Sequence, residues 1–350
     1  MKINDLLENT IKLNASDLHL TPGLKPIIRL KKDLKVLESY PVLTSENTAD
    51  LAAQLLNEKQ QKKLLDERQI DAGYTIRRDA RFRLNVFFAK GQICLAIRRI
   101  PFTIPSFKDL NLPEQIKEFT NFPNGLVLVT GAGGMGKSTT LASILDYINE
   151  TQAKHIVTLE DPIEYLFTNK KSFIQQRELG TDFTSFTQGL KGVLREDINV
   201  CLVGEMRDKD TIGNAVTVAE TGHMVYATLH TRTAAQSVAR IIDVFGEAQQ
   251  GQIRSQLADN LMGVITQRLV KSPSKGVVPA IEILSGTNAV RSLIREGKIH
   301  MIDNVIATSL EDGMLPLEKS LAELVNKGDI TKDVAMAQTS KPDVLKRFIN

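Results

Sequence analysis

The first hundred residues contain short segments in which apolar and polar positions alternate with a period of two, mixed with segments of helical period. Alternation of this kind is typical of strands with one buried face, and turn residues separate the segments. We therefore expect an N-terminal domain at 1–100 that combines helices with strands. The predicted strands are 17–20, 26–30, 71–76, 81–88 and 92–98, and the predicted helices are 5–13, 45–56 and 58–66.

Near residue 126 the pattern changes to almost fully apolar runs that alternate with helical stretches. Strands of a parallel sheet are covered on both faces and lose their polar positions, so this pattern predicts a mostly parallel sheet flanked by helices. We expect an α/β domain at 122–350 with helices after Gly286, joined to the first domain by a proline-interrupted linker at 101–121. The predicted strands are 126–130, 155–160, 200–204, 224–229 and 277–283, and the linker carries a predicted helix near 114–119.

A glycine-rich loop connects the first of these strands to a helical pattern. The spacing Gly131-x-x-x-x-Gly136-Lys137-Ser138 in this context is the Walker A arrangement. Glycines let backbone N–H groups turn toward phosphates, Lys137 reaches the β- and γ-phosphates, and Ser138 can ligate Mg²⁺. The alternative is a glycine-rich turn without a ligand. The residues predicted to bind ATP are Gly131, Ala132, Gly133, Gly134, Met135, Gly136, Lys137, Ser138 and Thr139.

Acidic residues follow two of the predicted strands. Glu205 follows 200–204, where many nucleotide hydrolases need an acid near the γ-phosphate, and we expect it to orient or activate water. Glu160, Asp161 and Glu164 gather at the end of another strand, where a cation or a water network would compensate their charge. We expect these three to organise Mg²⁺ and water. A solvated glutamate and an exposed acidic turn are the structural alternatives.

Two further features can contact phosphates. His230 ends the predicted strand at 224–229 and could hydrogen-bond a phosphate, although a lone histidine is also common in a structural role. Arg81 and Arg83 share one face of the strand at 81–88. They could act as arginine fingers that complete a nucleotide site supplied by another domain or subunit. A basic, solvated strand face would give the same spacing.

Composition narrows the class of protein. The chain has 350 residues, a length that favours two domains, with one large domain as the alternative. Of these residues 42% are hydrophobic and 24% charged, which is ordinary for a globular protein. A net charge of +3 gives no reason to expect nucleic acid or membrane binding, and no apolar run is long enough to span a bilayer. Cys94 and Cys201 lie in apolar runs, and we expect them to be buried free thiols.

Taken together, the motifs resemble the secretion ATPase superfamily of type II secretion and type IV pili, and within it the PilT-type twitching-motility ATPases. The resemblance runs nearly from end to end. The segments that carry it are ARFRLN at 80–85, GLVLVTGAGGMGKSTTLA at 125–142, TLEDPIEY at 158–165, LREDINVCLVGEMRD at 194–208, AETGHMVYATLHT at 219–231 and AVRSLIREGKI at 289–299.

The resemblance implies a PAS-like N-terminal domain, a RecA-like P-loop ATPase domain and a homohexamer that uses ATP and Mg²⁺. It implies that Glu205 is the catalytic glutamate, Glu164 its aspartate-box partner and His230 the histidine-box residue, and that Arg81 and Arg83 close over the phosphates. It also implies a cytoplasmic ring at the inner-membrane face of a pilus machine. There the ring would dock on an inner-membrane platform protein, without inserting in the membrane itself, and could act beside a paralogous motor.

Three positions or segments depart from the usual family pattern. Ala132-Gly133-Gly134-Met135 replaces Pro-Thr-Gly-Ser within the loop, and Asn199 replaces an aspartate before the strand at 200–204. In the segment at 289–299, which the resemblance links to retraction, Val290 and Ser292 replace isoleucine and asparagine. We expect a motor for pilus retraction. An accessory retraction paralogue, an extension or secretion ATPase, and a regulator that binds nucleotide with little turnover remain alternatives.

Overall fold

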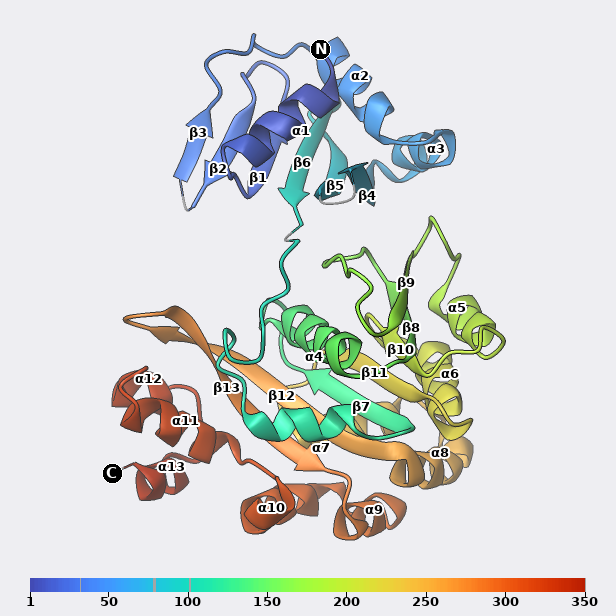
Figure 1. Cartoon of the computed structure of the whole chain (residues 1–350), viewed down its shortest axis with the longest axis vertical. Coiled ribbons are helices and arrows are strands. Elements are labelled where there is room, and N and C mark those ends of the chain that lie inside the picture. Colours follow the sequence, from blue (N-terminus) through green and yellow to red (C-terminus); the bar gives the residue numbers. More distant parts are fainter. Residues whose placement is uncertain (32, 78–79, 101, 350) are drawn as a thin grey trace. The chain divides into compact units, whose positions relative to one another are not determined.

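The computed structural model describes residues 1–31, 33–77, 80–100 and 102–349 (Figure 1). The chain forms two compact units. The first comprises Met1–Thr103 together with Pro162–Leu166, and the second comprises Ile104–Asp161 and Phe167–Asn350. Pro101, with which the predicted linker begins, lies outside the described residues. The α/β class expected from the sequence is confirmed.

The first unit is built on a six-stranded antiparallel sheet in the order β3-β2-β1-β6-β5-β4. Along β5, Phe82 and Leu84 are buried, while Arg81 and Arg83, which alternate with them, are half-exposed, as the alternation predicts. The apolar face packs against three helices in one core. The elements are β1 (Asp17–Leu20), β2 (Ile27–Leu30), β3 (Asp33–Val36), β4 (Gln69–Arg77), β5 (Ala80–Ala89), β6 (Gln92–Arg99), α1 (Ile3–Lys12), α2 (Ser45–Leu55) and α3 (Glu58–Glu67).

The second unit contains a seven-stranded sheet in the order β13-β12-β7-β11-β10-β8-β9. All neighbours are parallel except β12 and β13, which form an antiparallel pair. The predicted mostly parallel sheet is therefore present. Its strands are β7 (Gly125–Thr130), β8 (His155–Glu160), β9 (Phe173–Glu178), β10 (Val200–Val203), β11 (Met224–Leu229), β12 (Leu261–Ser272) and β13 (Gly276–Ser285).

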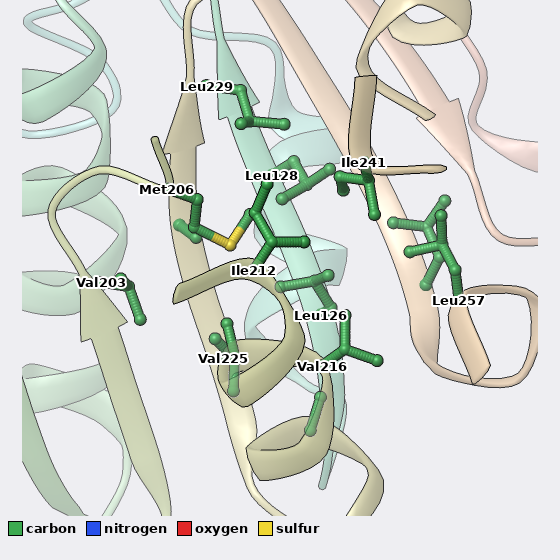
Figure 2. Packing of buried hydrophobic residues seen from close by; sticks show 14 of the residues in the cluster. Leu126, Leu128, Val203, Met206, Ile212, Val216, Val225, Leu229, Ile241 and Leu257 are labelled. Atoms are coloured by element: carbon green, nitrogen blue, oxygen red, sulfur yellow. The ribbon is translucent and has the colours of Figure 1, made fainter. Parts of the chain in front are cut away.

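Both faces of this sheet are covered, which explains its apolar strands. Leu126 and Leu128 of β7 belong to the core on one face, whereas Val127 and Val129 belong to the core on the other. Figure 2 shows the first of these cores, in which helix side chains lie over the sheet. The helices of this unit are α4 (Lys137–Thr151), α5 (Phe186–Val193), α6 (Lys209–Glu220), α7 (Ala234–Asp243), α8 (Glu247–Asn260), α9 (Asn288–Arg295), α10 (Ile302–Thr308), α11 (Leu317–Asn326), α12 (Lys332–Met336) and α13 (Pro342–Phe348), with 3₁₀ turns at Glu114–Thr120, Ile299–Met301 and Leu310–Asp312.

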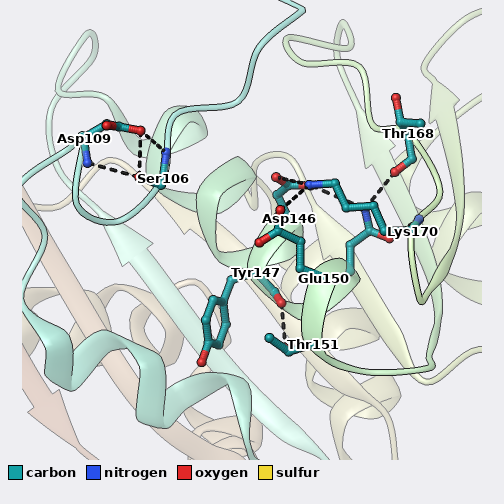
Figure 3. Close-up of polar contacts among 9 residues, drawn as sticks. Ser106, Asp109, Asp146, Tyr147, Glu150, Thr151, Thr168 and Lys170 are labelled. Atoms are coloured by element: carbon teal, nitrogen blue, oxygen red, sulfur yellow. Dashed lines mark hydrogen bonds and ion pairs between the residues drawn. The ribbon is translucent and has the colours of Figure 1, made fainter.

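Helix α4 is held from outside by the segment that leads into β9. The ammonium of Lys170 lies 2.9 Å from Oδ2 of Asp146 and 2.6 Å from Oε1 of Glu150, both on α4 (Figure 3). The buried Asn149 donates to the carbonyl of Thr168 at 2.8 Å. Because α4 begins at the end of the glycine-rich loop, these contacts help to fix the direction of its N-terminus.

Three strands were not predicted from the sequence. They are β3, β9 and β12, and β12 is the most consequential because it pairs with β7 in parallel. The predicted helical tail is present as α9 to α13, and α11 to α13 pack against residues of the β12–β13 hairpin in a separate apolar cluster. Cys94 and Cys201 are free and buried, as expected.

Candidate active site

The loop between β7 and α4 has a backbone conformation that glycine adopts readily. Gly131, Gly134 and Gly136 have φ of 149°, 74° and 79°, where a Cβ atom would be costly. Helix α4 begins at Lys137, so the positive end of its dipole lies at the loop, and Ser138 follows in its first turn. N–H groups and a helix N-terminus together make an anion site. The local geometry is therefore suited to phosphate.

The side chain of Lys137 folds over this loop. Its ammonium donates to the carbonyl of Gly131 at 2.9 Å and to that of Ala132 at 3.0 Å. The residue is 8% exposed. The positive charge is thereby held within the loop, where it can form an ion pair with an anion bound to the loop N–H groups.

Glu205 is fixed by the strands on both sides of β10. The N–H of Gly204 donates to the carbonyl of Leu159 in β8 at 2.8 Å, and the hydroxyl of Thr228 in β11 donates to the carbonyl of Gly204 at 2.5 Å. The N–H of Met206 donates to the carbonyl of Thr228 at 3.1 Å. The residues before and after Glu205 are therefore both anchored, and its position at the strand end is well defined.

The carboxylate of Glu205 lies between two basic side chains. Arg207 donates to Oε2 at 2.7 Å, and Nε2 of His230 is 3.2 Å from Oε1. Burial disfavours the charged form, but the hydrogen bond and charge of Arg207, together with His230, outweigh it and lower the pKa of Glu205. The group is ionised at neutral pH, which is the form that accepts a proton from water.

His230 brings this carboxylate to the glycine-rich loop. A Cβ atom built on Gly133 would lie 4.0 Å from Cε1 of His230. The loop, His230 and Glu205 follow β7, β11 and β10, which are neighbours in the sheet. The structure thus joins three predicted site features that are far apart in sequence.

Hydroxyl groups connect the base of the loop to the segment after His230. Oγ1 of Thr130 lies 3.0 Å from Oγ1 of Thr266 in β12, and the hydroxyl of Ser237 in α7 donates to Oγ1 of Thr130 at 3.3 Å. The hydroxyls of Ser237 and Thr231 are 2.6 Å apart. This chain holds the segment that follows His230 against the strand that leads into the loop.

The acidic residues at the end of β8 and just after it lie in two different units of the structure. Oε1 of Glu160 accepts hydrogen bonds from the hydroxyl of Thr158 at 2.6 Å and from the amide of Gln176 at 3.1 Å. The pKa of Arg207 is raised, first by its hydrogen bond to Glu205 and also by the charge of Asp161. Glu160 and Asp161 lie in the second unit, and Asp161 interacts electrostatically with Arg207.

Glu164 belongs to the first unit, as do the predicted arginine fingers. Nη1 of Arg83 lies 3.8 Å from Oε1 of Glu164, and Arg81 donates to the hydroxyl of Thr75 at 2.8 Å. Arg83 and Glu164 also line a cavity of about 160 Å³ together with other arginines of this unit. The structure thus brings Glu164 to Arg83.

The chain matches a known protein family over nearly its whole length. The family described as "Type II/IV secretion system protein" matches residues 1–341. This chain belongs to that family. It is 41% identical over 343 residues to the type IV pilus retractation ATPase PilT of Pseudomonas aeruginosa, covering 98% of this chain and 99% of the relative. A twitching motility protein of Neisseria gonorrhoeae is 43% identical over 311 residues, covering 89% of this chain and 83% of the relative.

A solved structure, a crystal structure of the pilus retraction motor PilT with bound ADP, has a TM-score of 0.90 and 44% identity, covering 99% of both chains. The resemblance inferred from the motifs is therefore confirmed. In the part of the chain that the structure describes, no helix combines the length and hydropathy that crossing a membrane requires.

Sequence reasoning missed two site residues of this secretion-family chain. Arg207 lies two positions after Glu205, and its basic side chain within the GEMRD segment was the available signal. Gln267 contacts the glycine-rich loop from β12, and because β12 itself was not predicted, no local pattern pointed to it.

Glu282 anchors the start of α7, the helix that follows His230. Its Oε1 accepts from the N–H of Ala234 at 2.7 Å. The pKa of Glu282 is raised to about 7. Burial is the main cause, Asp303 and Glu318 add to it, and the Ala234 hydrogen bond and Arg268 oppose it. An acid with a raised folded pKa binds more protons in the folded state, so stability is lost as pH rises from about 4.5 toward 7.

We expect Glu282→Gln to remove this pH dependence, because glutamine can still accept from Ala234 and carries no charge. Relative to the unmodified chain, the variant should gain about 3 kcal/mol in free energy of unfolding as pH rises through that window. Denaturant unfolding at several pH values measures it, with Glu311→Gln at an exposed position as the control. Parallel stability curves for Glu282→Gln and the unmodified chain would contradict the assignment.

Proposed function

We propose that the chain is a hexameric, ATP-hydrolysing motor that powers retraction of type IV pili. The observation that carries the proposal is the end-to-end match to a pilus retractation ATPase and to a solved pilus retraction motor. The predicted enzyme class, an ATPase, is confirmed by the family and by these relatives. The use of an adenine nucleotide agrees with the ADP in the solved relative.

The residues of the site can divide ATP hydrolysis into phosphate binding and activation of water. The loop N–H groups, the α4 N-terminus and Lys137 bind the phosphates and stabilise charge on the transferred group. Glu205 orients a water molecule for attack on the γ-phosphorus and takes up its proton, while the bond to the β-phosphate oxygen breaks and leaves ADP and phosphate. His230, between Glu205 and the loop, responds to the presence of the γ-phosphate.

Mg²⁺ fits the residues predicted to hold it. Ser138, Glu160 and Asp161 offer only oxygen ligands, which Mg²⁺ prefers, and it normally combines one or two carboxylates with waters and phosphates. Among the described residues no cluster of three or more His, Cys, Asp or Glu side chains is arranged to bind a metal. A site completed by the nucleotide's own phosphates agrees with that. When bound, the ion neutralises charge on the phosphates.

The remaining parts of the proposal concern assembly. Arg81 and Arg83 act as fingers on a nucleotide held by the second unit of the same or a neighbouring subunit, and Glu164 sets the position of Arg83. The ring works in the cytoplasm at the inner-membrane face of the pilus machine, on a platform protein and without nucleic acid. A paralogous motor acts beside it. Mass measurement of the purified chain with ATP tests the hexamer, and phosphate release tests the turnover.

If Arg83 is a finger, Arg83→Ala should lower ATP turnover by about tenfold or more, because removed arginine fingers cost large factors in rate. Turnover by phosphate release measures the loss. Arg68→Ala removes an arginine of the same unit that lies over the ring of Phe88 and serves as the control. A loss below about twofold at Arg83 would assign it to the solvated strand face instead.

A further inference from the structure

β12 extends beside the glycine-rich loop. It runs parallel to β7, with Thr266 paired to Thr130 at the last position of β7. Because β12 continues to Ser272, its next residue, Gln267, lies at the level where the loop begins. Gln267 is 3% exposed. A buried amide needs partners for both of its polar atoms, and the loop and its helix supply them.

Both ends of the Gln267 side chain are used. Its Nε2 donates to the carbonyl of Met135 in the loop at 2.7 Å, and its Oε1 accepts from the hydroxyl of Thr140 in the first turn of α4 at 2.6 Å. One side chain from a distant strand therefore ties the loop to the helix that follows it.

The loop backbone also lies directly against this residue. A Cβ atom on Gly131 would be 2.4 Å from the carbonyl oxygen of Gln267, and one on Gly136 would be 2.9 Å from its Nε2. The N–H of Leu269 donates to Sδ of Met135 at 3.3 Å. The first and last glycines of the loop and the Met135 side chain therefore all contact β12 at or near Gln267.

The bond to Met135 sets the direction of a loop N–H. In a trans peptide the C=O of one residue and the N–H of the next point in opposite directions. Holding the Met135 carbonyl against Gln267 therefore turns the N–H of Gly136 away from β12. N–H groups fixed in direction before the anion arrives bind it without an ordering cost at that moment.

We propose that Gln267 is a positioning residue that presets the glycine-rich loop for the phosphates of the nucleotide. The proposal rests on the proposed function, since it needs the loop to be the nucleotide site. It predicts that loss of the amide lowers the free energy of nucleotide binding more than it lowers the free energy of unfolding. Because the preset loop serves ground state and transition state alike, KM should rise more than kcat falls.

The test is the binding of a fluorescent ADP analogue to the full chain. Gln267→Leu, which keeps the size and removes both hydrogen bonds, should raise the Kd about tenfold. Thr140→Val should raise it in the same direction, and the double variant should add little to Gln267→Leu. Ser320→Ala is the matched control, because Ser320 is a buried acceptor for the N–H of Ile281 on β13, and its Kd should stay within about twofold of the unmodified chain.

Gln267→Glu separates positioning from simple structural damage. A carboxylate cannot donate to the Met135 carbonyl, whereas the protonated acid donates through its O–H and accepts from Thr140 as the amide does. The ratio of the Kd of this variant to the Kd of the unmodified chain at the same pH should therefore fall toward one as pH is lowered from about 8 to about 5.5. A role confined to the fold would make the stability of the variant depend on pH but would leave the ratio of the two Kd values constant for the folded chains.

The outcomes are distinguishable. Gln267→Leu and Gln267→Glu that bind within about twofold of the unmodified chain at every pH, while Lys137→Ala loses binding, would overturn the positioning role and keep the nucleotide site. Unimpaired binding by Lys137→Ala would overturn the site itself. If Gln267→Leu does not fold, Thr140→Val and the pH dependence of Gln267→Glu decide in its place.

Discussion

Replacing Lys137 with alanine is expected to abolish ATP hydrolysis, with a loss of at least about a hundredfold in kcat/KM. The ammonium is already held in the loop, 2.9 Å from the carbonyl of Gly131 and 3.0 Å from that of Ala132. Its positive charge thus lies within hydrogen-bond distance of the loop's own backbone. Without it the phosphates would lose the side-chain cation that the loop itself carries, and charge that moves onto the β-phosphate during hydrolysis would be less well stabilised.

Phosphate release by the purified chain measures this effect, and binding of a fluorescent ADP analogue shows how much of it is lost affinity. Lys191→Ala is the control, because Lys191 is an exposed lysine of α5. Undiminished phosphate release by Lys137→Ala would remove the phosphate-binding assignment of the loop, and with it the positioning role of Gln267.

Replacing Glu205 with glutamine is expected to slow hydrolysis by about a hundredfold to ten-thousandfold while nucleotide binding persists. Glutamine keeps the shape: its carbonyl oxygen can accept from Arg207, and its amide NH₂ can donate to Nε2 of a neutral His230, so the surroundings remain in place. What disappears is the negative charge that orients the water and takes its proton. The lowered pKa of Glu205 means that the unmodified side chain carries that charge at neutral pH.

Single-turnover hydrolysis measures the loss of the chemical step, and nucleotide binding measured separately shows whether affinity has changed. Glu196→Gln is a closely matched control, because Glu196 forms a 2.7 Å ion pair with Arg177 in the same unit, as Glu205 does with Arg207. Turnover of Glu205→Gln equal to that of the unmodified chain would show that another residue is the general base. A loss of nucleotide binding in the variant would instead make Glu205 part of the binding site.

The parts of the site that the sequence predicted share one property, which is a strong local pattern. The strand, glycine loop and helix around Lys137 are contiguous, and Glu205 and His230 each end an apolar strand. Since parallel strands end at one edge of a sheet, the nearness of Glu205 to His230 follows from those strand assignments. The 3.2 Å contact between them agrees with that reasoning.

The parts that the sequence could not predict depend on pairings between distant segments. Gln267 reaches Met135 across 132 positions, and nothing around Gln267 distinguishes it from other polar residues of an apolar run. The raised pKa of Glu282 has the same origin, because its burial and its nearness to Asp303 and Glu318 exist only in the folded chain. Arg207 differs, since its role could have been inferred from its spacing to Glu205.

The central claim is that this ATPase retracts pili, and one measurement tests it most directly. Surface pili and single-cell twitching would be counted in a deletion strain of the source organism, restored with the unmodified chain or with Lys137→Ala. The account predicts excess pili and lost motility in the deletion strain, with rescue by the unmodified chain and none by Lys137→Ala. Absent pili would identify an extension motor instead, and normal pili with normal motility would contradict a role as the main retraction motor.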